Sequence, residues 1–166
     1  MPRKKPAKAA RAVANAGVFT PIGKKLRKAK RPAGGHVKPL EVGEYKSLKA
    51  REKVGDNLEH DHIPSSAALK RAEENRLGRK LTRKEADDLH NKGTAIELPK
   101  GVHSKGDTWR GRNTQDQIDA DAADLSKAAE RDYATTRKNL IADGFSPKDV
   151  DAALDKMREA NRKKGI

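Results

Sequence analysis

The sequence predicts an α+β fold that is mostly helical, with a small two-stranded antiparallel ribbon and additional helices. The 166 residues are only 34% hydrophobic and 3% aromatic, so one small core of Leu, Ile, Val and Ala is the most that they can bury. Two short stretches alternate as strands do, and several longer ones repeat apolar residues every three or four positions. A large all-β domain is not expected from this composition.

The chain is strongly basic, with 38 Lys and Arg against 24 Asp and Glu and a formal net charge of +14. This charge favours a polyanionic partner, nucleic acid before an anionic membrane; a solvated basic face without a partner is the alternative. The absence of cysteine excludes disulfides, zinc-thiolate sites and cysteine nucleophiles. We find no signal-peptide apolar region and no run long enough to cross a bilayer, so no membrane insertion is expected.

Residues 1–39 are predicted to be a basic, disordered tail or linker. They contain five prolines, the pair Gly34-Gly35 and a dense run of Lys and Arg over residues 24–31. Like charges at that density repel one another and leave little to bury. Such an arm adds non-specific contacts to phosphates.

Ordered structure is expected to begin at Leu40 with a short helix or turn. Tyr45, Leu48 and Val54 fall on one stripe of it. The sequence Gly55-Asp56-Asn57 then supplies the turn residues that end this segment.

A first strand is predicted over Leu58–Ile63, and Pro64 ends its ladder of hydrogen bonds. Successive side chains of a strand point to opposite faces. Glu59 and Asp61 therefore share one face, and His60 and His62 share the other.

Two helices are predicted next, over residues 66–77 and 82–90. Serine precedes the first helix and Gly78 follows it, which is typical of helix ends. The second opens on Thr82 and Glu85, which have the spacing of a capping box.

A second strand is predicted over Thr94–Leu98, closed by Pro99 and paired with the first strand. The segment 101–113 that follows is too rich in glycine for regular structure, but it is dense in side chains that bind nucleic acid. Those expected to do so are Lys105, Trp109, Arg110 and Arg112.

The last part of the chain is predicted to form two structural helices. The first runs from Thr114 to Gly144, and the second opens on Ser146 and Pro147 as cap and first residue. The sequence thus predicts three parts: the tail 1–39, a core 40–113 that carries the chemistry, and a helical extension 114–166 packed on that core.

The acid and histidine residues have a recognisable order along the chain. The sequence Asp61-His62-Ile63-Pro64, then Ala95-Ile96-Glu97-Leu98-Pro99, then His103, resembles the HNH or ββα-metal nuclease superfamily, which includes endonuclease VII-like enzymes. The run from Leu58 to Ala68 is similar to HNH-type toxin domains at the C-termini of bacterial secreted effectors. The resemblance covers residues 42–113 and implies a ββα-metal core.

The resemblance also implies roles for individual residues. Asp61 and His103 would bind one divalent metal ion, and His62 would be the general base that activates water. A carboxylate oxygen and an imidazole suit magnesium, manganese, nickel or zinc, and a neutral imidazole accepts a proton near pH 7.

The sequence departs from the superfamily pattern at two points. The asparagine that gives the superfamily its name has no clear counterpart, and the residue four positions after His103 is Asp107 instead of a histidine. The third metal ligand is therefore open. The residues that could supply it, or orient a ligand, are Glu59, His60, Asn91 and Asp107.

The resemblance implies a metal-dependent endonuclease that acts as an antibacterial toxin, with DNA as the expected substrate and RNA as the alternative. It implies an acidic immunity protein as partner, and a secretion machinery such as type VI secretion or a larger parent effector. Secretion would occur without a classical signal peptide, with action in the cytoplasm of a target cell. A non-catalytic basic nucleic-acid-binding protein and a metal-independent ribonuclease toxin are the alternatives.

Overall fold

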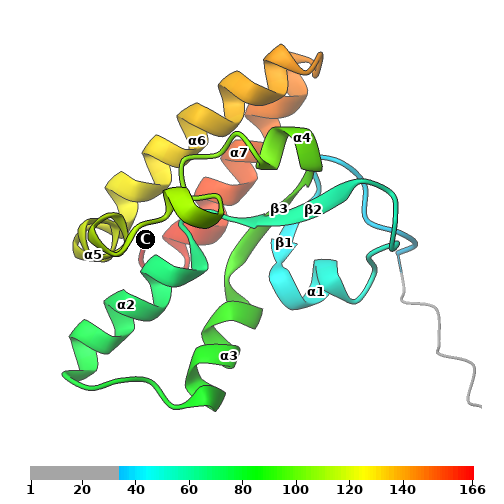
Figure 1. Cartoon of the computed structure of the whole chain (residues 1–166). Helices are drawn as coiled ribbons and strands as arrows, with labels where there is room; N and C mark the ends of the chain where they lie inside the picture. The colour runs from blue at the N-terminus through cyan, green and yellow to red at the C-terminus, as the bar shows by residue number, and fades with distance from the viewer. Residues whose placement is uncertain (1–33) are drawn as a thin grey trace, which may run out of the picture. The chain divides into compact units, whose positions relative to one another are not determined.

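Three antiparallel strands form the sheet that carries the predicted site residues. The structure is a computed structural model that describes residues 34–166 (Figure 1). Strand β3 (Thr94–Pro99) is central, with β1 (Val42–Glu44) on one edge and β2 (Leu58–His62) on the other. The predicted pairing of the two site strands is confirmed. Of the predicted tail 1–39, residues 1–33 lie outside the described residues. Val37 is buried in a core cluster with Leu48 and Ala95, so the packed part of the chain begins before Leu40.

Seven α-helices accompany the sheet in the described residues, which confirms a mostly helical α+β fold. In chain order they are α1 (Tyr45–Lys49), α2 (Ser66–Leu77), α3 (Arg83–Lys92), α4 (Lys100–His103), α5 (Gln115–Ala123), α6 (Leu125–Ala142) and α7 (Pro147–Arg162). A single 3₁₀ turn covers Arg110–Arg112.

The sheet has three strands, so the prediction of a two-stranded ribbon was wrong in that respect. Val42–Glu44 was assigned to a helix or turn, but these residues pair with Thr94–Ile96. A strand of three residues is too short to show alternation, and it forms because the buried β3 needs partners for its hydrogen bonds on both edges. Val54 is 90% exposed, so it belongs to no buried stripe.

Two predictions about helices also need correction. The helix expected from Thr114 to Gly144 is broken at Asp124, whose extended backbone ends α5 and whose carboxylate accepts a hydrogen bond from the amide of Lys127 at 2.9 Å. Aspartate at this position caps a new helix instead of continuing the old one. The segment 101–113 was expected to be irregular from its start, but Lys100–His103 form the one-turn helix α4.

The helix boundaries predicted from capping residues are confirmed. Ser65 caps α2 through the amide of Ala68. The side chains of Thr82 and Glu85 form the reciprocal hydrogen bonds of a capping box at the start of α3. Ser146 caps α7, with Pro147 as its first residue.

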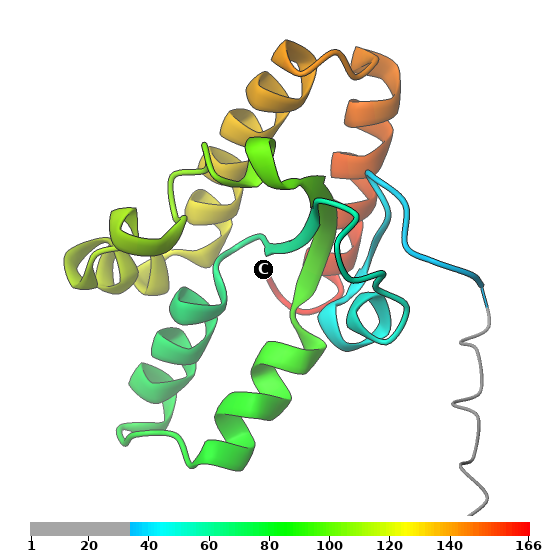
Figure 2. The ribbon, with the colours of Figure 1, turned by 45° about the vertical axis from the view of Figure 1, so that its right-hand side comes forward.

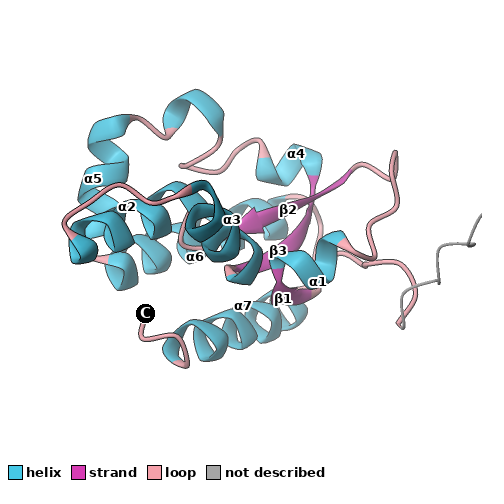
Figure 3. Cartoon of the chain, turned by 90° about the horizontal axis from the view of Figure 1, so that it is seen from below, coloured by secondary structure: helices cyan, strands magenta, loops and turns pink. Residues whose placement is uncertain are grey.

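Helices cover both faces of the sheet. On one face, Ile96 and Leu98 pack against α6 and α7 in the main hydrophobic core, which includes Tyr133 and Leu154. On the other face, Ala95 packs against α1 in a smaller cluster. Figure 3 shows α7 beneath the strands, and Figure 2 shows α2 and α3 as a helical hairpin that extends away from the sheet.

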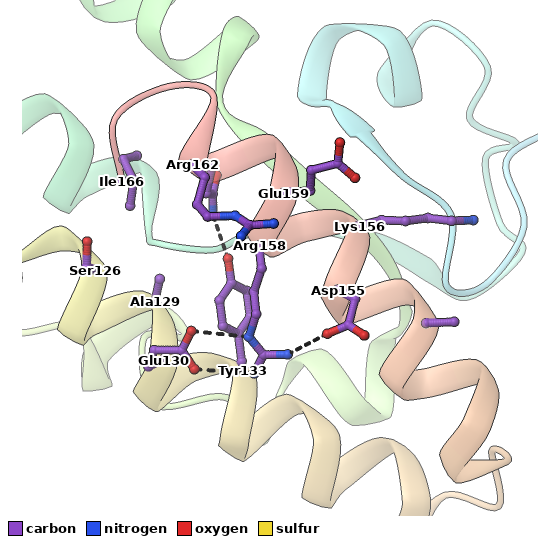
Figure 4. Close-up of a pocket in the computed structure, with 12 residues that line it drawn as sticks. Ser126, Ala129, Glu130, Tyr133, Asp155, Lys156, Arg158, Glu159, Arg162 and Ile166 are labelled. Carbon is purple, nitrogen blue, oxygen red and sulfur yellow. Dashed lines mark hydrogen bonds and ion pairs between the residues drawn. The ribbon is translucent and has the colours of Figure 1, made fainter.

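A buried asparagine ties the last helix to the end of β2. The Nδ2 of Asn161, on α7, donates to the carbonyl oxygen of Ile63 at 2.7 Å and to the hydroxyl oxygen of Tyr133 at 2.6 Å. Tyr133 also borders an open hollow of about 540 Å³ between α6 and α7, where Arg158 lies over its ring (Figure 4). Ile63 directly follows His62, so α7 holds the backbone beside the predicted site.

We predict that Asn161→Leu lowers the free energy of unfolding by about 2 to 4 kcal/mol, because it leaves a buried carbonyl and a buried hydroxyl without a partner. Tyr133→Phe removes only the hydroxyl and should cost about 1 kcal/mol. Urea unfolding of both variants measures the difference. Equal losses would show that the bond to Ile63 contributes nothing of its own.

Candidate functional site

The alternation of β2 divides the acid and histidine residues between two faces of the sheet. Glu59 and Asp61 lie on the face where α4 packs, and both contact His103. His60 and His62 lie on the opposite face, and both contact the ring of Tyr45. The structure therefore brings Asp61 and His103 together, as predicted, and does not bring His62 to the same place.

His103 lies between two carboxylates. Its Nδ1 is 2.7 Å from Oε2 of Glu59, and its Nε2 is 3.4 Å from Oδ1 of Asp61. Burial disfavours the imidazolium, but the hydrogen bonds and negative charges of Asp61 and then Glu59 outweigh it, so the pKa of His103 is raised. His103 is held at the end of α4, directly after β3, where the β2–β3 pairing places it beside Asp61.

The distance between the donor atoms of Asp61 and His103 is compatible with two ligands of one divalent cation. Donor atoms that each lie ~2.1 Å from one ion are roughly 3.0 to 3.4 Å apart, which matches the Oδ1–Nε2 distance of 3.4 Å. Glu59 stands where a carboxylate orients a metal-binding histidine through its other nitrogen. No group of three or more His, Cys, Asp or Glu in residues 34–166 is placed to hold a metal ion. Waters would have to fill most of the coordination shell, as they commonly do for Mg²⁺.

Asp107 does not join His103. Its Oδ2 accepts a hydrogen bond from the hydroxyl of Thr135 at 2.6 Å and lies 4.0 Å from Nε of Arg131. The segment is not helical through Asp107, because α4 ends at His103. The structure therefore places this residue against α6 instead of beside the cation pair.

One buried acidic residue that the sequence analysis did not single out lies on α6, the helix that packs against α4. Asp132 on α6 is 5% exposed, and its Oδ1 accepts hydrogen bonds from Arg131 at 2.7 and 2.9 Å. Burial raises its pKa to about 6, against the lowering effect of Arg131 and with a further raising effect from Asp61. Nothing in its sequence context, a helix of mixed charge, distinguishes it from a surface aspartate.

His62 lies in a stack of rings on the other face. Its ring centroid is 4.7 Å from that of Tyr45 and 4.5 Å from that of His90, and its Nε2 is 2.9 Å from the carbonyl oxygen of His90. Burial is the main cause that lowers the pKa of His62 to about 4. The imidazole is thus neutral at pH 7, and since Nε2–H must donate to that carbonyl, the lone pair is on Nδ1.

His60 is paired with a buried acid. Its Nδ1 is hydrogen-bonded to Oε2 of Glu97, which is 2% exposed, and its Nε2 lies 3.4 Å from Oε2 of Glu52. Burial raises the pKa of Glu97, opposed by His60. These contacts place His60 away from Asp61 and His103 and give it a partner of its own. Asn91 lies in α3, before β3.

The predicted nucleic-acid contacts lie in the segment of the chain that follows α4. The guanidinium of Arg110 lies 4.3 Å from the centroid of the Trp109 ring, while Arg112 donates to the carbonyl oxygen of Ser104. Trp109 and Arg110 border an open hollow of about 570 Å³ together with Lys100. Lys105 is exposed. A polyanion in this hollow would meet Lys100, Arg110 and the aromatic ring of Trp109.

The chain is similar to one named protein. It is 52% identical over 130 residues to "Deoxyribonuclease CdiA" of Dickeya dadantii (strain 3937). The match covers 78% of this chain but 4% of that protein, so the chain spans a small fraction of the relative's length. No family model and no solved structure matches the chain.

Gly93 provides a test of the ring stack around His62. A Cβ added there would lie 2.7 Å from Cδ2 of His62, whereas one added at Gly101 would meet nothing within 4 Å. Tyr45 and His90 leave the imidazole no room to retreat. We predict that Gly93→Ala lowers the free energy of unfolding by about 1 to 3 kcal/mol and shifts the His62 ring resonances. Gly101→Ala, the control, should do neither. Unchanged His62 resonances in Gly93→Ala would contradict the stacked position.

Proposed function

We propose that this chain is a deoxyribonuclease domain that hydrolyses phosphodiester bonds at the Asp61–His103 pair. The observation that carries the proposal is the 52% identity over 130 residues to a protein named as a deoxyribonuclease. Similarity at this level over most of a chain implies the same fold and, in the absence of changes at the site, the same chemistry. The pairing of β2 with β3, followed by the helix with His103, supports an HNH-type assignment.

In this proposal, Asp61 and His103 hold one divalent cation, of magnesium, manganese, nickel or zinc. When bound, the cation stabilises negative charge on the scissile phosphate and the leaving oxygen. Glu59 orients the His103 ring through Nδ1. Because the raised pKa of His103 reflects its contact with two carboxylates, a proton and a cation compete for Nε2, and cation binding strengthens as the pH rises.

His62 remains our proposed proton acceptor. It is neutral at pH 7 with a free lone pair on Nδ1, and it adjoins Asp61 in the chain. In this structure the His62 ring lies in the stack with Tyr45 and His90, on the face of β2 opposite to the Asp61–His103 pair. The ring would therefore have to change its position, when DNA or the cation binds, to reach a phosphate at that pair. Catalytic hydrogen bonds often form only in the substrate complex.

The charge distribution bears on how DNA is held. Residues 1–33 contain 11 of the 38 Lys and Arg and none of the 24 Asp and Glu. The remaining chain is almost balanced, with 27 basic and 24 acidic side chains. We therefore propose that DNA is bound by a local cationic surface, Lys100, Lys105, Arg110 and Arg112, with the N-terminal segment adding non-specific contacts.

We further propose that the domain is a toxin carried by a larger effector and neutralised by a cognate acidic immunity protein. The match to a small part of a much longer protein supports a parent chain. An inhibitor with Asp and Glu would be complementary to the residues 100–112, which contain four Lys and Arg and one Asp. No helix of residues 34–166 is long and apolar enough to cross a membrane.

A metal-independent ribonuclease is the second candidate, and one observation favours it. His103 has a raised pKa and His62 a lowered one, the arrangement that an acid and a base of a general acid–base pair require. The two rings lie on opposite faces of β2, which weighs against joint action on one phosphate. Cleavage that persists in a chelator would establish it.

We predict that the protein nicks plasmid DNA only with a divalent cation, tested with Mg²⁺, Mn²⁺, Ni²⁺, Zn²⁺ and a chelator. Asp61→Ala should lose cation affinity and cleavage together, because it removes a ligand. His62→Ala should slow cleavage by roughly 10² to 10⁴-fold while calorimetry shows unchanged cation affinity. Full cleavage by His62→Ala would leave His62 with a packing role, and full cleavage by Asp61→Ala would refute the site.

We predict that the double variant Lys105→Ala and Arg110→Ala weakens binding to duplex DNA and flattens its salt dependence. Each lost phosphate contact should reduce the slope of log affinity against log salt by about 0.9. Arg137→Ala is the control, because Arg137 on α6 is paired with Asp151 at 2.6 Å. Fluorescence anisotropy at several salt concentrations measures the slope. An unchanged slope in the double variant would place DNA elsewhere.

A further inference from the structure

The hollow beside α4 adjoins the proposed site along the chain. Lys100 and Ser104 border it, and Ser104 directly follows His103, the last residue of that helix. Asn57 also borders it, and this residue immediately precedes the first residue of β2. The hollow therefore begins one residue away from a member of the Asp61–His103 pair.

Trp109 gives this hollow an aromatic wall, and it is the single tryptophan of the sequence. Its ring is half-buried, and the guanidinium of Arg110 lies 4.3 Å from the ring centroid. A planar cation and a nucleobase both bind to the face of an indole ring. The ring thus holds, in the structure, a group of the kind that a base could replace.

Arg110 is able to leave the ring for a phosphate. Its side chain is exposed, and the indole ring is the contact that the structure gives its guanidinium. Arg112 differs, because it donates to the carbonyl oxygen of Ser104 and so fastens the loop to the end of α4. The loop can therefore stay in place while Arg110 turns from the ring to a phosphate.

The backbone at the hollow has an unusual conformation. In residues 34–166, three non-glycine residues have a positive φ, and two of them border this hollow: Asn57 at 60° and Arg110 at 48°. Asparagine tolerates this region, but arginine adopts it rarely. Such conformations cluster at ligand sites, where the surrounding structure holds them. The conformation of Arg110 fixes the step from the indole ring to the guanidinium, so the two groups are presented together.

The size and the polar groups of the hollow suit one nucleotide. Its volume of about 570 Å³ lies within the range of small-ligand sites, roughly 300 to 1,000 Å³. Lys100 and Arg110 can contact a phosphate, while the side chains of Asn57 and Asp143 offer oxygens that accept hydrogen bonds from a base. A base inside a duplex has both faces covered by its neighbours, so only an unstacked base can lie on the ring of Trp109.

We propose that this hollow binds one unpaired nucleotide of DNA, with its base stacked on Trp109 and its phosphate held by Lys100 and Arg110. This inference rests on the proposed nuclease and names its substrate class, which is DNA with an unpaired base beside the scissile phosphate. Single strands, loops and duplexes opened at one position belong to this class. A fully paired duplex binds less well here, because opening it costs free energy.

The single tryptophan reports this contact without any variant. The full chain is titrated, in a chelator, with a single strand, with the same strand fully paired, with that duplex carrying one unpaired nucleotide, and with a strand of equal length without bases. The single strand and the duplex with one unpaired nucleotide should quench the Trp109 emission, because a stacked base quenches an indole. The paired duplex and the strand without bases should not. Equal quenching by the strand without bases would overturn the proposal.

Variants of Trp109 measure how much the stack contributes to binding. Trp109→Ala should weaken binding of a labelled single strand by roughly 5- to 150-fold, the loss expected for one base on one aromatic ring. It should keep the wild-type affinity for the strand without bases, which also shows that the variant is folded. Trp109→Phe retains a ring and should restore much of the binding. Fluorescence anisotropy of the labelled strands measures these affinities. Equal affinities of wild type and Trp109→Ala for the single strand would overturn the proposal.

Plasmid cleavage with a divalent cation is assayed separately, so that the two proposals can fail independently. Quenching that depends on unpaired bases, without any DNA cleavage, would refute the nuclease and leave the nucleotide site standing. DNA cleavage by a protein whose Trp109 emission does not respond to unpaired bases would do the reverse.

Discussion

The antiparallel pairing of β2 with β3 is the constraint on which the candidate site depends. Its register sets Asp61 opposite Ile96 and Leu58 opposite Pro99, so the chain leaves β3 beside the start of β2. Helix α4 begins there and is only four residues long, which returns His103 to Asp61 within one turn. A slip of one residue would exchange the faces of β2 and send Asp61 toward Tyr45. Ile96 and Leu98, buried against α6 and α7, fix the register.

The same alternation that assembles the acid–histidine pair separates it from the other histidines. His60 and His62 lie against α1, where Nδ1 of His60 is hydrogen-bonded to Glu97 and Nε2 of His62 to the carbonyl oxygen of His90. The two faces have opposite effects on their imidazoles: burial beside Tyr45 lowers the pKa of His62 to about 4, and two carboxylates raise that of His103. One strand therefore holds one imidazole neutral and favours the charged form of another at the same pH.

Much of this fold could be predicted from residues whose effect is local. Helix starts could be predicted at Ser65, Thr82 and Ser146, because each side chain accepts a hydrogen bond from a backbone amide of the first turn that has no partner within the helix. Pro147 supports the last of these starts, since its fixed φ suits the first helical position. The meeting of Asp61 with His103 followed from two strands and the residue order. Features that depend on distant partners were missed: β1 forms because β3 has a free edge, and Asp107 contacts Thr135 and Arg131 of α6 instead of joining His103. No periodicity encodes either fact.

The C-terminal helices are the reason that the site cannot be understood from its motif alone. Asn161 of α7 holds the carbonyl oxygen of Ile63, next to His62, and Arg131 of α6 draws Asp107, Asp121 and Asp132 toward one point. An arginine that neutralises one charge among three acids leaves a net negative charge around Arg131, in a part of the chain whose overall charge is nearly balanced. The cationic residues around Trp109 lie along the segment between α4 and α5. A phosphate attracted by those cations would be repelled by Glu59 and Asp61 unless a divalent cation lies between them, which is the arrangement that we propose at the Asp61–His103 pair.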